Sequence, residues 1–284
     1  MSVAFGYKIS QLVAEEFWLD GGAMFGSVPK TLWSKLITVD DQNRIQLCTR
    51  LLLLESSASS NPRRALIDVG CGDKWSDKER AIFKIHSKLK ADLEEVVGNP
   101  TDIILTHLHF DHAGGITKRL EDGTTKRRFL HQRVFVSEKN FKHACAPGPR
   151  ERASYLQENI EPLLQGPLEF CVDGKEVLPN VFVFQSNGHT PGLQWVRVGY
   201  GKGSIAFPAD LIPTSRHLQI PYVMGYDLCA QSTMDEKAQF LNQAVEEEWV
   251  IVFEHDPDVA AAIIHRDEKG RFAIKERVDL PTIT

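Results

Sequence analysis

The chain has 284 residues, of which 42% are hydrophobic and 25% are charged, as in an ordinary globular protein with a sizeable core. Its formal net charge is −5, so the composition gives no reason to expect nucleic acid or an anionic membrane surface as a partner. The five cysteines are widely spaced and form no C-x-x-C pair, which indicates neither a disulfide framework nor a cysteine zinc site. Because no signal peptide and no membrane-spanning run are visible, we expect a cytoplasmic protein.

Apolar runs separated by turn signals predict a series of strands. The first two, residues 44–55 and 64–70, flank the serine-rich segment 55–64, which we expect to be a hairpin loop. Further strands are expected at residues 101–106, 133–137, 181–186, 193–199, 203–210, 249–255, 259–265 and 271–278, the last pairing with the run before it.

Helical periodicity occupies three segments between these strands. Residues 76–97 begin with Ser76 as N-cap and Glu79 as its capping-box partner, and their apolar residues predict one long helix. Residues 151–165 and 233–249 have the same periodicity. The mixture of strands and helices predicts layered sheets and helices in a single domain, residues 1–284.

A basic stretch at residues 117–133 raises the alternative of a nucleic-acid site. Its acidic residues and the Asp122–Gly123 pair favour a solvated hairpin instead.

The segment "DIILTHLHFDHAGG", residues 102–115, places four potential metal ligands within six residues: His107, His109, Asp111 and His112. Burying such groups is unfavourable unless something pairs with them, so we predict a metal site rather than a cluster of surface histidines. In extended geometry His107 and His109 point the same way and can share one metal. Asp111 and His112 are then free to bind another.

Three more candidate ligands follow the ends of later strand patterns: His189 in "NGHTPG", Asp210 and His255. Imidazole and carboxylate ligands suit zinc, and also manganese or iron. We therefore expect two divalent metal ions, Zn²⁺ first, with Mn²⁺ or Fe²⁺ as alternatives.

This ordered set, H-x-H-x-D-H, then G-H-T-P-G, a strand-terminal aspartate and a late histidine, resembles the metallo-β-lactamase superfamily between Ala65 and His255. The resemblance implies an α/β fold, the αβ/βα sandwich, with two mixed β-sheets face to face, helices outside and the site at one edge. It implies one metal bound by His107, His109 and His189, the other by Asp111, His112 and His255, and Asp210 as the bridge. It also implies that Asp68 supports the ligands through a hydrogen bond. On spacing alone, Asp68 is equally a turn residue.

Two metals of this kind would share a water molecule and lower its pKa, and the metal-bridging hydroxide would attack carbon or phosphorus. Asp111 is the expected catalytic residue, orienting the hydroxide and passing a proton to the leaving group. No G-x-S-x-G nucleophile motif is present. The predicted reaction class is metal-assisted hydrolysis.

The nature of the bond cleaved stays open at this level. The chain is similar to quorum-quenching lactonases and organophosphate hydrolases, although the tyrosine that the lactonases have three residues after the bridging aspartate is Pro213 here. Three hypotheses remain: a hydrolase of lactones or related carboxylic esters, a phosphotriester or phosphodiester hydrolase, and a low-turnover ligand-binding regulatory protein that keeps the metal fold. The expected partner is a small-molecule ester, lactone or phosphoester, and a homodimer is possible.

Residues 17–33, within the N-terminal segment 1–40, combine large apolar residues with glycines. They predict either a lid that covers the pocket, with Met24 and Phe25 facing the substrate, or an ordinary strand and loop packed on the sheet. His217 either lines the pocket or, as we favour, lies on the surface.

Overall fold

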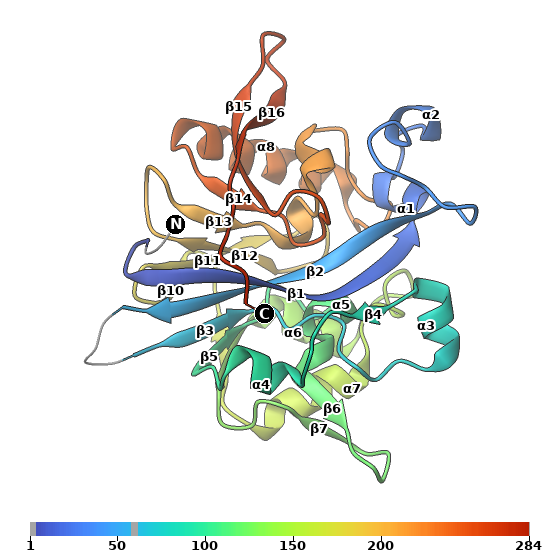
Figure 1. Cartoon of the computed structure of the whole chain (residues 1–284), viewed down its shortest axis with the longest axis vertical. Coiled ribbons are helices and arrows are strands. Elements are labelled where there is room, and N and C mark those ends of the chain that lie inside the picture. The colour runs from blue at the N-terminus through green and yellow to red at the C-terminus, as the bar shows by residue number, and fades with distance from the viewer. Residues whose placement is uncertain (1–3, 58–61, 284) are drawn as a thin grey trace.

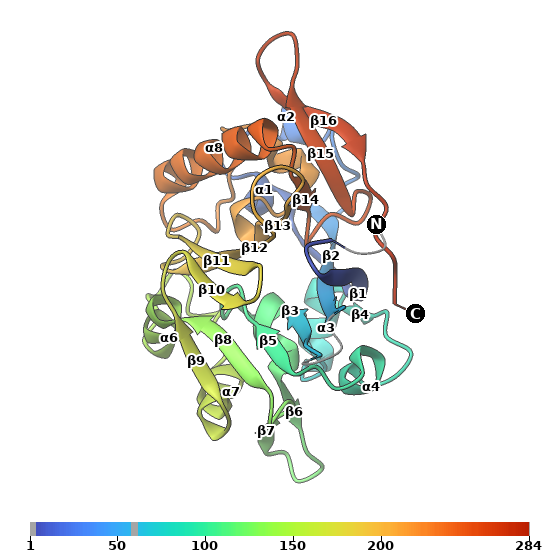
Figure 2. The same cartoon turned by 90° about the vertical axis from the view of Figure 1, so that its left-hand side faces the viewer.

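The computed structural model describes residues 4–57 and 62–283, which form two seven-stranded sheets stacked face to face (Figures 1 and 2). The first sheet has the order β4-β1-β2-β3-β5-β8-β9 and the second the order β10-β11-β12-β13-β14-β15-β16. Each sheet contains both parallel and antiparallel pairs. The predicted αβ/βα sandwich of two mixed sheets is therefore confirmed.

The first sheet is built around two long antiparallel strands. Its strands are β1 (Tyr7–Asp20), β2 (Arg44–Ser56), β3 (Arg64–Ile67), β4 (His86–Ser87), β5 (Asp102–Ile104), β8 (Arg133–Ser137) and β9 (Leu168–Cys171). The antiparallel pairing of β2 with β3 agrees with the predicted hairpin, whose loop lies in part outside the described residues. A strand was expected here only as one of the two readings of residues 17–33, which overlap the end of β1. The earlier part of β1 was not predicted, because polar residues such as Gln11 and Glu15 interrupt its apolar alternation.

The second sheet collects the strands from the C-terminal half of the chain. They are β10 (Lys175–Leu178), β11 (Val181–Ser186), β12 (Leu193–Val198), β13 (Ile205–Phe207), β14 (Val250–Val252), β15 (Ala261–Arg266) and β16 (Phe272–Arg277). The predicted pairing of the last two runs, β15 with β16, is confirmed.

Short helices cover the outer faces of the sandwich, and one longer helix, α8, covers the second sheet (Figure 2). The α-helices are α1 (Gly21–Phe25), α2 (Lys30–Trp33), α3 (Asp77–Phe83), α4 (Leu93–Val97), α5 (Phe110–Ala113), α6 (Glu138–Cys145), α7 (Gln157–Ile160) and α8 (Ala230–Glu246). The 3-10 helices are η1 (Gly114–Ile116), η2 (Glu161–Gln165), η3 (Ala209–Leu211) and η4 (Ser215–Leu218). No helix in the described part of the chain is long and apolar enough to cross a bilayer.

The cores follow from the alternation of side chains along buried strands. On β2, Leu52 and Leu54 face the interior between the sheets, whereas Leu51 and Leu53 pack under the outer helices. Because both faces of this strand are covered, its sequence is continuously apolar over these residues.

Two helix predictions are wrong. Residues 76–97 form α3 and α4 with β4 between them, because Lys84 takes a left-handed backbone conformation and His86, expected within a helix, pairs with β1 at the sheet edge. The capping box between Ser76 and Glu79 is present. Residues 151–165 contain only α7 and η2, where Pro162 lies in the first turn of the 3-10 helix.

The other two local predictions hold. The helix expected at residues 233–249 is α8. The basic segment forms the predicted hairpin, with β6 (Thr117–Arg119) paired to β7 (Thr125–Arg127). Lys118 and Arg128 in this segment both form ion pairs with Glu94, so part of its charge is neutralised.

Candidate metal centre

The H-x-H-x-D-H motif lies directly after β5, at the edge of the sandwich. The strand itself ends at Ile104, and the single turn α5 carries Asp111 and His112. This turn is held close to the loop after β3, where Val69 N donates to His112 O at 2.9 Å. A Cβ atom on Gly114 would lie 2.1 Å from the carbonyl oxygen of Cys71, so this close approach requires glycine.

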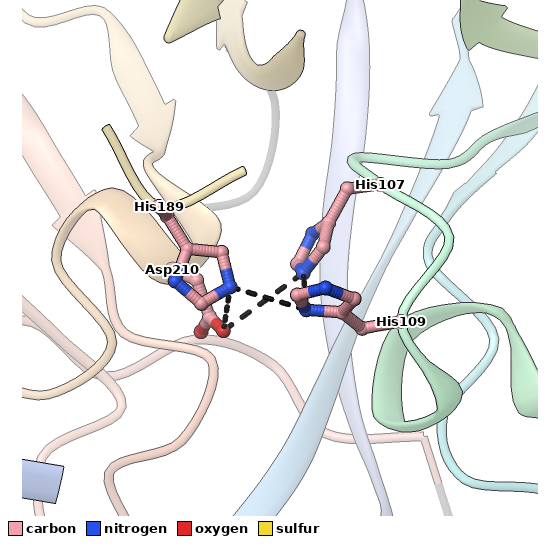
Figure 3. Close-up of side chains that lie close together, drawn as sticks. All are labelled: His107, His109, His189 and Asp210. Carbon is pink, nitrogen blue, oxygen red and sulfur yellow. Dashed lines mark hydrogen bonds and ion pairs between the residues drawn. The ribbon is translucent and has the colours of Figure 1, made fainter. Parts of the chain in front are cut away.

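Three histidines and one carboxylate converge as the first group of candidate ligands (Figure 3). The Nδ1 atom of His109 lies 3.0 Å from His107 Nε2 and 3.1 Å from His189 Nε2. Asp210 Oδ2 lies 3.1 Å from His189 Nε2. His189 follows β11 and Asp210 lies in η3 after β13, so the second sheet supplies half of this group.

The second group lies on the other side of Asp210 and contains Asp111, His112 and His255. The Nε2 atoms of His112 and His255 are 3.2 Å apart, and Asp111 Oδ2 is 3.7 Å from His255 Nε2. Asp210 Oδ1 lies 3.1 Å from His255 Nε2, while its other oxygen faces His189. One carboxylate therefore stands between two histidine clusters, as a bridging ligand would.

All seven predicted ligand residues are at most 7% exposed, and the structure brings all seven together. The imidazole nitrogens face each other at hydrogen-bond distance, yet two neutral acceptor nitrogens cannot bond to each other without a proton between them. A cation satisfies all of them at once. The donor set, nitrogen and carboxylate oxygen, fits zinc-type divalent ions.

The charges in the cluster lead to the same conclusion. Burial lowers the pKa of His107 well below its usual value. At His189 and His255, burial is again the largest influence and acts in the same direction, but nearby carboxylates together outweigh it and raise the pKa to about 10 and about 9. These carboxylates are Asp210 and Asp227 at His189, and Asp210 and Glu254 at His255. In the absence of metal, these two rings are therefore protonated, and a bound cation would displace the protons on the nitrogens that face the centre.

At His189 and His255, the ring nitrogen that faces away from the candidate metal positions has a hydrogen-bond partner of its own. His189 Nδ1 lies 2.9 Å from Asp227 Oδ1, and His255 Nδ1 lies 2.9 Å from Cys48 O. A hydrogen bond of this kind fixes the tautomer and the orientation of a histidine ligand. Asp227 was not predicted, because it lies 38 positions after His189 in the sequence and belongs to no recognisable motif.

His112 has two such carboxylates. Its Nδ1 atom is 3.0 Å from Asp68 Oδ2 and 3.0 Å from Glu254 Oε2. Asp68 takes a left-handed backbone conformation (φ 57°) and also accepts hydrogen bonds from the backbone and the hydroxyl of Thr106. Burial raises the pKa of Glu254 to about 8. Glu254 was not predicted, although its position directly before the candidate ligand His255 could have indicated that it lies near the centre.

A cavity of about 220 Å³ opens over the centre. Asp111, Asp210 and three of the histidines form its floor. Its walls are mainly apolar and include Leu19, Met24, Leu47, Phe83, Phe110 and Met224. Such a pocket suits a substrate whose apolar part lies beside the reacting bond.

The predicted pocket residues divide into one that lines the cavity and two that lie behind it. Met24 lines the cavity. The Phe25 ring stacks on Trp33 and on His217, at centroid distances of 5.3 and 4.9 Å. The surface placement favoured for His217 is wrong, because this residue is 1% exposed and its Nε2 lies 2.8 Å from Met24 O. Residues 17–33 thus pack on the sheet while also lining the cavity.

Comparison with known proteins gives one family. Residues 63–255 match the Metallo-beta-lactamase superfamily. N-acyl homoserine lactonases from Bacillus sp and Bacillus cereus are 27% and 26% identical over 171 residues, covering 58% of this chain and 60% of theirs. The chain thus matches about three fifths of the length of these curated relatives.

Solved structures cover nearly the whole chain. A probable metal-dependent hydrolase from Staphylococcus aureus superposes with a TM-score of 0.81 and 25% identity, over 96% of this chain and 99% of that one. AidC, a dizinc quorum-quenching lactonase, gives 0.74 with 17% identity, over 98% and 97%. The hydrolase AbOPH gives 0.72 with 18% identity, over 98% and 96%. The last two establish the fold alone. The chain belongs to the metallo-β-lactamase superfamily.

Proposed function

We propose that this protein is a metal-dependent hydrolase that cleaves a lactone or a related carboxylic ester at a pair of divalent cations, Zn²⁺ in the first place. The observation that supports this most directly is the position of Asp210, with one oxygen at His255 and the other at His189. Lactonases are among the relatives by sequence, and the mainly apolar cavity suits an acyl chain.

The residues divide into two ligand sets. In the proposal His107, His109 and His189 hold one cation, Asp111, His112 and His255 hold the other, and Asp210 is shared. Bound there, the cations supply a Lewis acid and lower the pKa of a coordinated water toward neutrality.

The chain itself orients the reactants. Asp111 lines the cavity, whereas its neighbour His112 is fully buried. The Asp111 carboxylate is therefore the group placed to accept a hydrogen bond from the attacking water and to carry a proton to the leaving oxygen. The apolar walls formed by Met24, Phe110 and Met224 exclude bulk water and hold the acyl group next to the scissile bond.

Metal analysis of the purified protein tests the ligand assignment. We expect about two metal ions per chain, as a dinuclear site requires, and loss of most of this metal in the His109→Ala and Asp210→Ala variants. His131→Ala, which removes an exposed histidine outside both groups, is the matched control and keeps the full metal content. A folded, metal-free protein from a metal-replete preparation would overturn the proposal.

A substrate panel tests the reaction. Lactones, aryl esters, phosphotriesters and phosphodiesters are compared by kcat/KM with the metal-loaded protein. The proposal requires the highest values for lactones or carboxylic esters. A preference of orders of magnitude for phosphoesters would replace it with the phosphotriester or phosphodiester hydrolase. Binding without turnover across the panel would replace it with a ligand-binding regulatory protein.

A further inference from the structure

Arg150 is the only arginine or lysine among the described residues that line the cavity. Its Nη2 atom donates to the carbonyl oxygens of Gly225 and Asp227, which belong to the loop on the cavity wall. The side chain of Arg150 is exposed, and these two bonds hold its guanidinium beside the cavity.

No acidic side chain in the described part of the chain forms an ion pair with Arg150, and its Nη1 and Nε atoms make no hydrogen bond there. Several other arginines have carboxylate partners, such as Arg128 with Glu94 and Arg216 with Asp256. An arginine that is fixed in place and still has free donors is ready to bind a ligand.

The acidic neighbour of Arg150 does not neutralise it. Glu151 is buried, and its carboxylate contacts His143 Nε2 and accepts a hydrogen bond from Thr190 Oγ1 at 3.0 Å. Its other near contact, at 3.8 Å, is His109 Nε2. Glu151 lines the cavity as well, but its carboxylate is engaged by His143 and Thr190. The positive charge of Arg150 therefore stays available to a molecule in the cavity.

We propose that Arg150 binds an anionic group of the substrate, a carboxylate or a phosphate, at a distance from the bond that is cleaved. This inference rests on the proposed function and narrows it to esters or lactones that carry a second, anionic end. The Nη1 and Nε atoms of Arg150, which make no hydrogen bond within the described residues, can donate charge-assisted hydrogen bonds to such an oxyanion. Because backbone carbonyls already fix Arg150, little side-chain entropy is lost on binding.

The remaining walls determine what lies between the two polar ends. Met24, Phe110 and Met224 give this space an apolar lining. Tyr226, adjacent to Gly225, also lines the cavity, and its hydroxyl makes no hydrogen bond within the described residues. Burial raises the pKa of this hydroxyl to about 12, so at neutral pH it remains a donor. The expected substrate is an ester with an apolar body and an oxyanion at its far end.

Matched esters test the inference. The esters have equal length and differ only in the far end of the molecule, which is a methyl group, a carboxylate or a phosphate. The kcat/KM of the metal-loaded protein is measured for each ester. We expect the wild type to favour an anionic ester over its neutral counterpart by about ten-fold or more, because only the anionic ester can accept charge-assisted hydrogen bonds from Arg150. Comparing kcat/KM for the carboxylate ester and the phosphate ester shows which oxyanion Arg150 binds better.

The key variant is Arg150→Met, for which the anionic-to-neutral ratio of kcat/KM should fall about ten-fold, mainly through KM. Arg150→Lys keeps the charge but not the planar set of donors held by the backbone carbonyls, and should restore part of the ratio. Arg152→Met is the matched control, because Arg152 is exposed, as Arg150 is, but does not line the cavity. Its ratio should equal that of the wild type.

Two outcomes overturn the inference: a wild type that does not favour the anionic esters, and a ratio that is unchanged in Arg150→Met. In the latter case, equal losses for both esters would mean that Arg150 only fastens the loop of Gly225 and Asp227. If no ester is cleaved, the proposed function fails separately. Calorimetric binding of the corresponding uncleavable amides to wild type and Arg150→Met then decides the role of Arg150.

Discussion

His189 and Asp227 form a buried pair, with Nδ1 of the histidine 2.9 Å from Oδ1 of the aspartate. The second oxygen of Asp227 accepts a hydrogen bond from Met224 N at 3.1 Å. Asp227 thus connects a candidate metal ligand to the wall of the cavity, and the orientation of the His189 ring depends on the loop that also holds Arg150.

Replacing Asp227 with alanine should weaken metal binding about 10–100-fold, the range seen when the outer partner of a histidine ligand is lost. The reason is that the His189 ring loses the acceptor that fixes its tautomer and direction. Competition for Zn²⁺ with a chromophoric chelator measures the effect. Asp235→Ala, on the exposed face of α8, is the control and should bind zinc like the wild type. Equal affinities for all three proteins would contradict the prediction.

Zinc binding to the metal-free protein should release protons at neutral pH. His189 and His255 have pKa values raised to about 10 and about 9, so both rings are protonated before the metal displaces those protons. Metal affinity should therefore rise as the pH increases from about 6 to 9. Calorimetry in two buffers of different ionisation enthalpy counts the protons. A binding enthalpy that is the same in both buffers would show that zinc binding releases no protons, which would contradict the prediction.

Removing the metal with a chelator should lower the melting temperature, and adding Zn²⁺ should restore it. A ligand present at 1,000 times its dissociation constant stabilises the native state by about 4 kcal/mol. The effect should be large here, because the centre joins residues from both sheets, such as His107 and Asp210. Thermal unfolding of Asp210→Ala, with and without chelator, is the comparison. A wild type whose melting temperature does not respond to chelation would be inconsistent with a metal that links the sheets.

Met24 and Phe25 should respond differently to truncation. Met24→Ala widens the cavity and should change the ranking of acyl chain lengths by kcat/KM, with the metal content unchanged. Phe25→Ala removes a ring packed between Trp33 and His217 and should lower the free energy of unfolding by about 3–5 kcal/mol. Denaturant titration and a chain-length series distinguish the two. A loss of metal in Met24→Ala with an unchanged ranking would exclude its role as a pocket residue.

Glu15 should make stability depend on pH. Burial raises the pKa of this carboxyl from 4.5 to about 7, although Thr49 and the backbone N–H groups of Cys71 and Gly72 donate hydrogen bonds to it. A raised pKa gives stability that is present below pH 4.5 and is lost as the pH rises through 7.

The shift of Glu15 corresponds to a decrease of about 3 kcal/mol in the free energy of unfolding across this range. In Glu15→Gln this dependence should be absent. Denaturant titrations of both proteins between pH 4.5 and 8 give the comparison, and parallel profiles would refute the assignment.

The sequence by itself determined the superfamily, the apolar strands and the seven candidate ligands. Residues 107–112 are contiguous, and the glycines after them indicate a tight turn, so local chemistry was sufficient to identify this part of the centre. Periodicity failed at residues 76–97, because pairing of His86 with β1 is a tertiary interaction that overrides helical spacing.

Only the tertiary structure decided what surrounds the ligands. His109 and His189, 80 residues apart, meet because the two sheets stack with their loops at one edge. Asp227 and Arg150 gain their positions from contacts across that edge, including backbone carbonyls that no sequence pattern marks. Such contacts depend on how long loops pack together, and loop packing has no periodicity that a sequence can reveal.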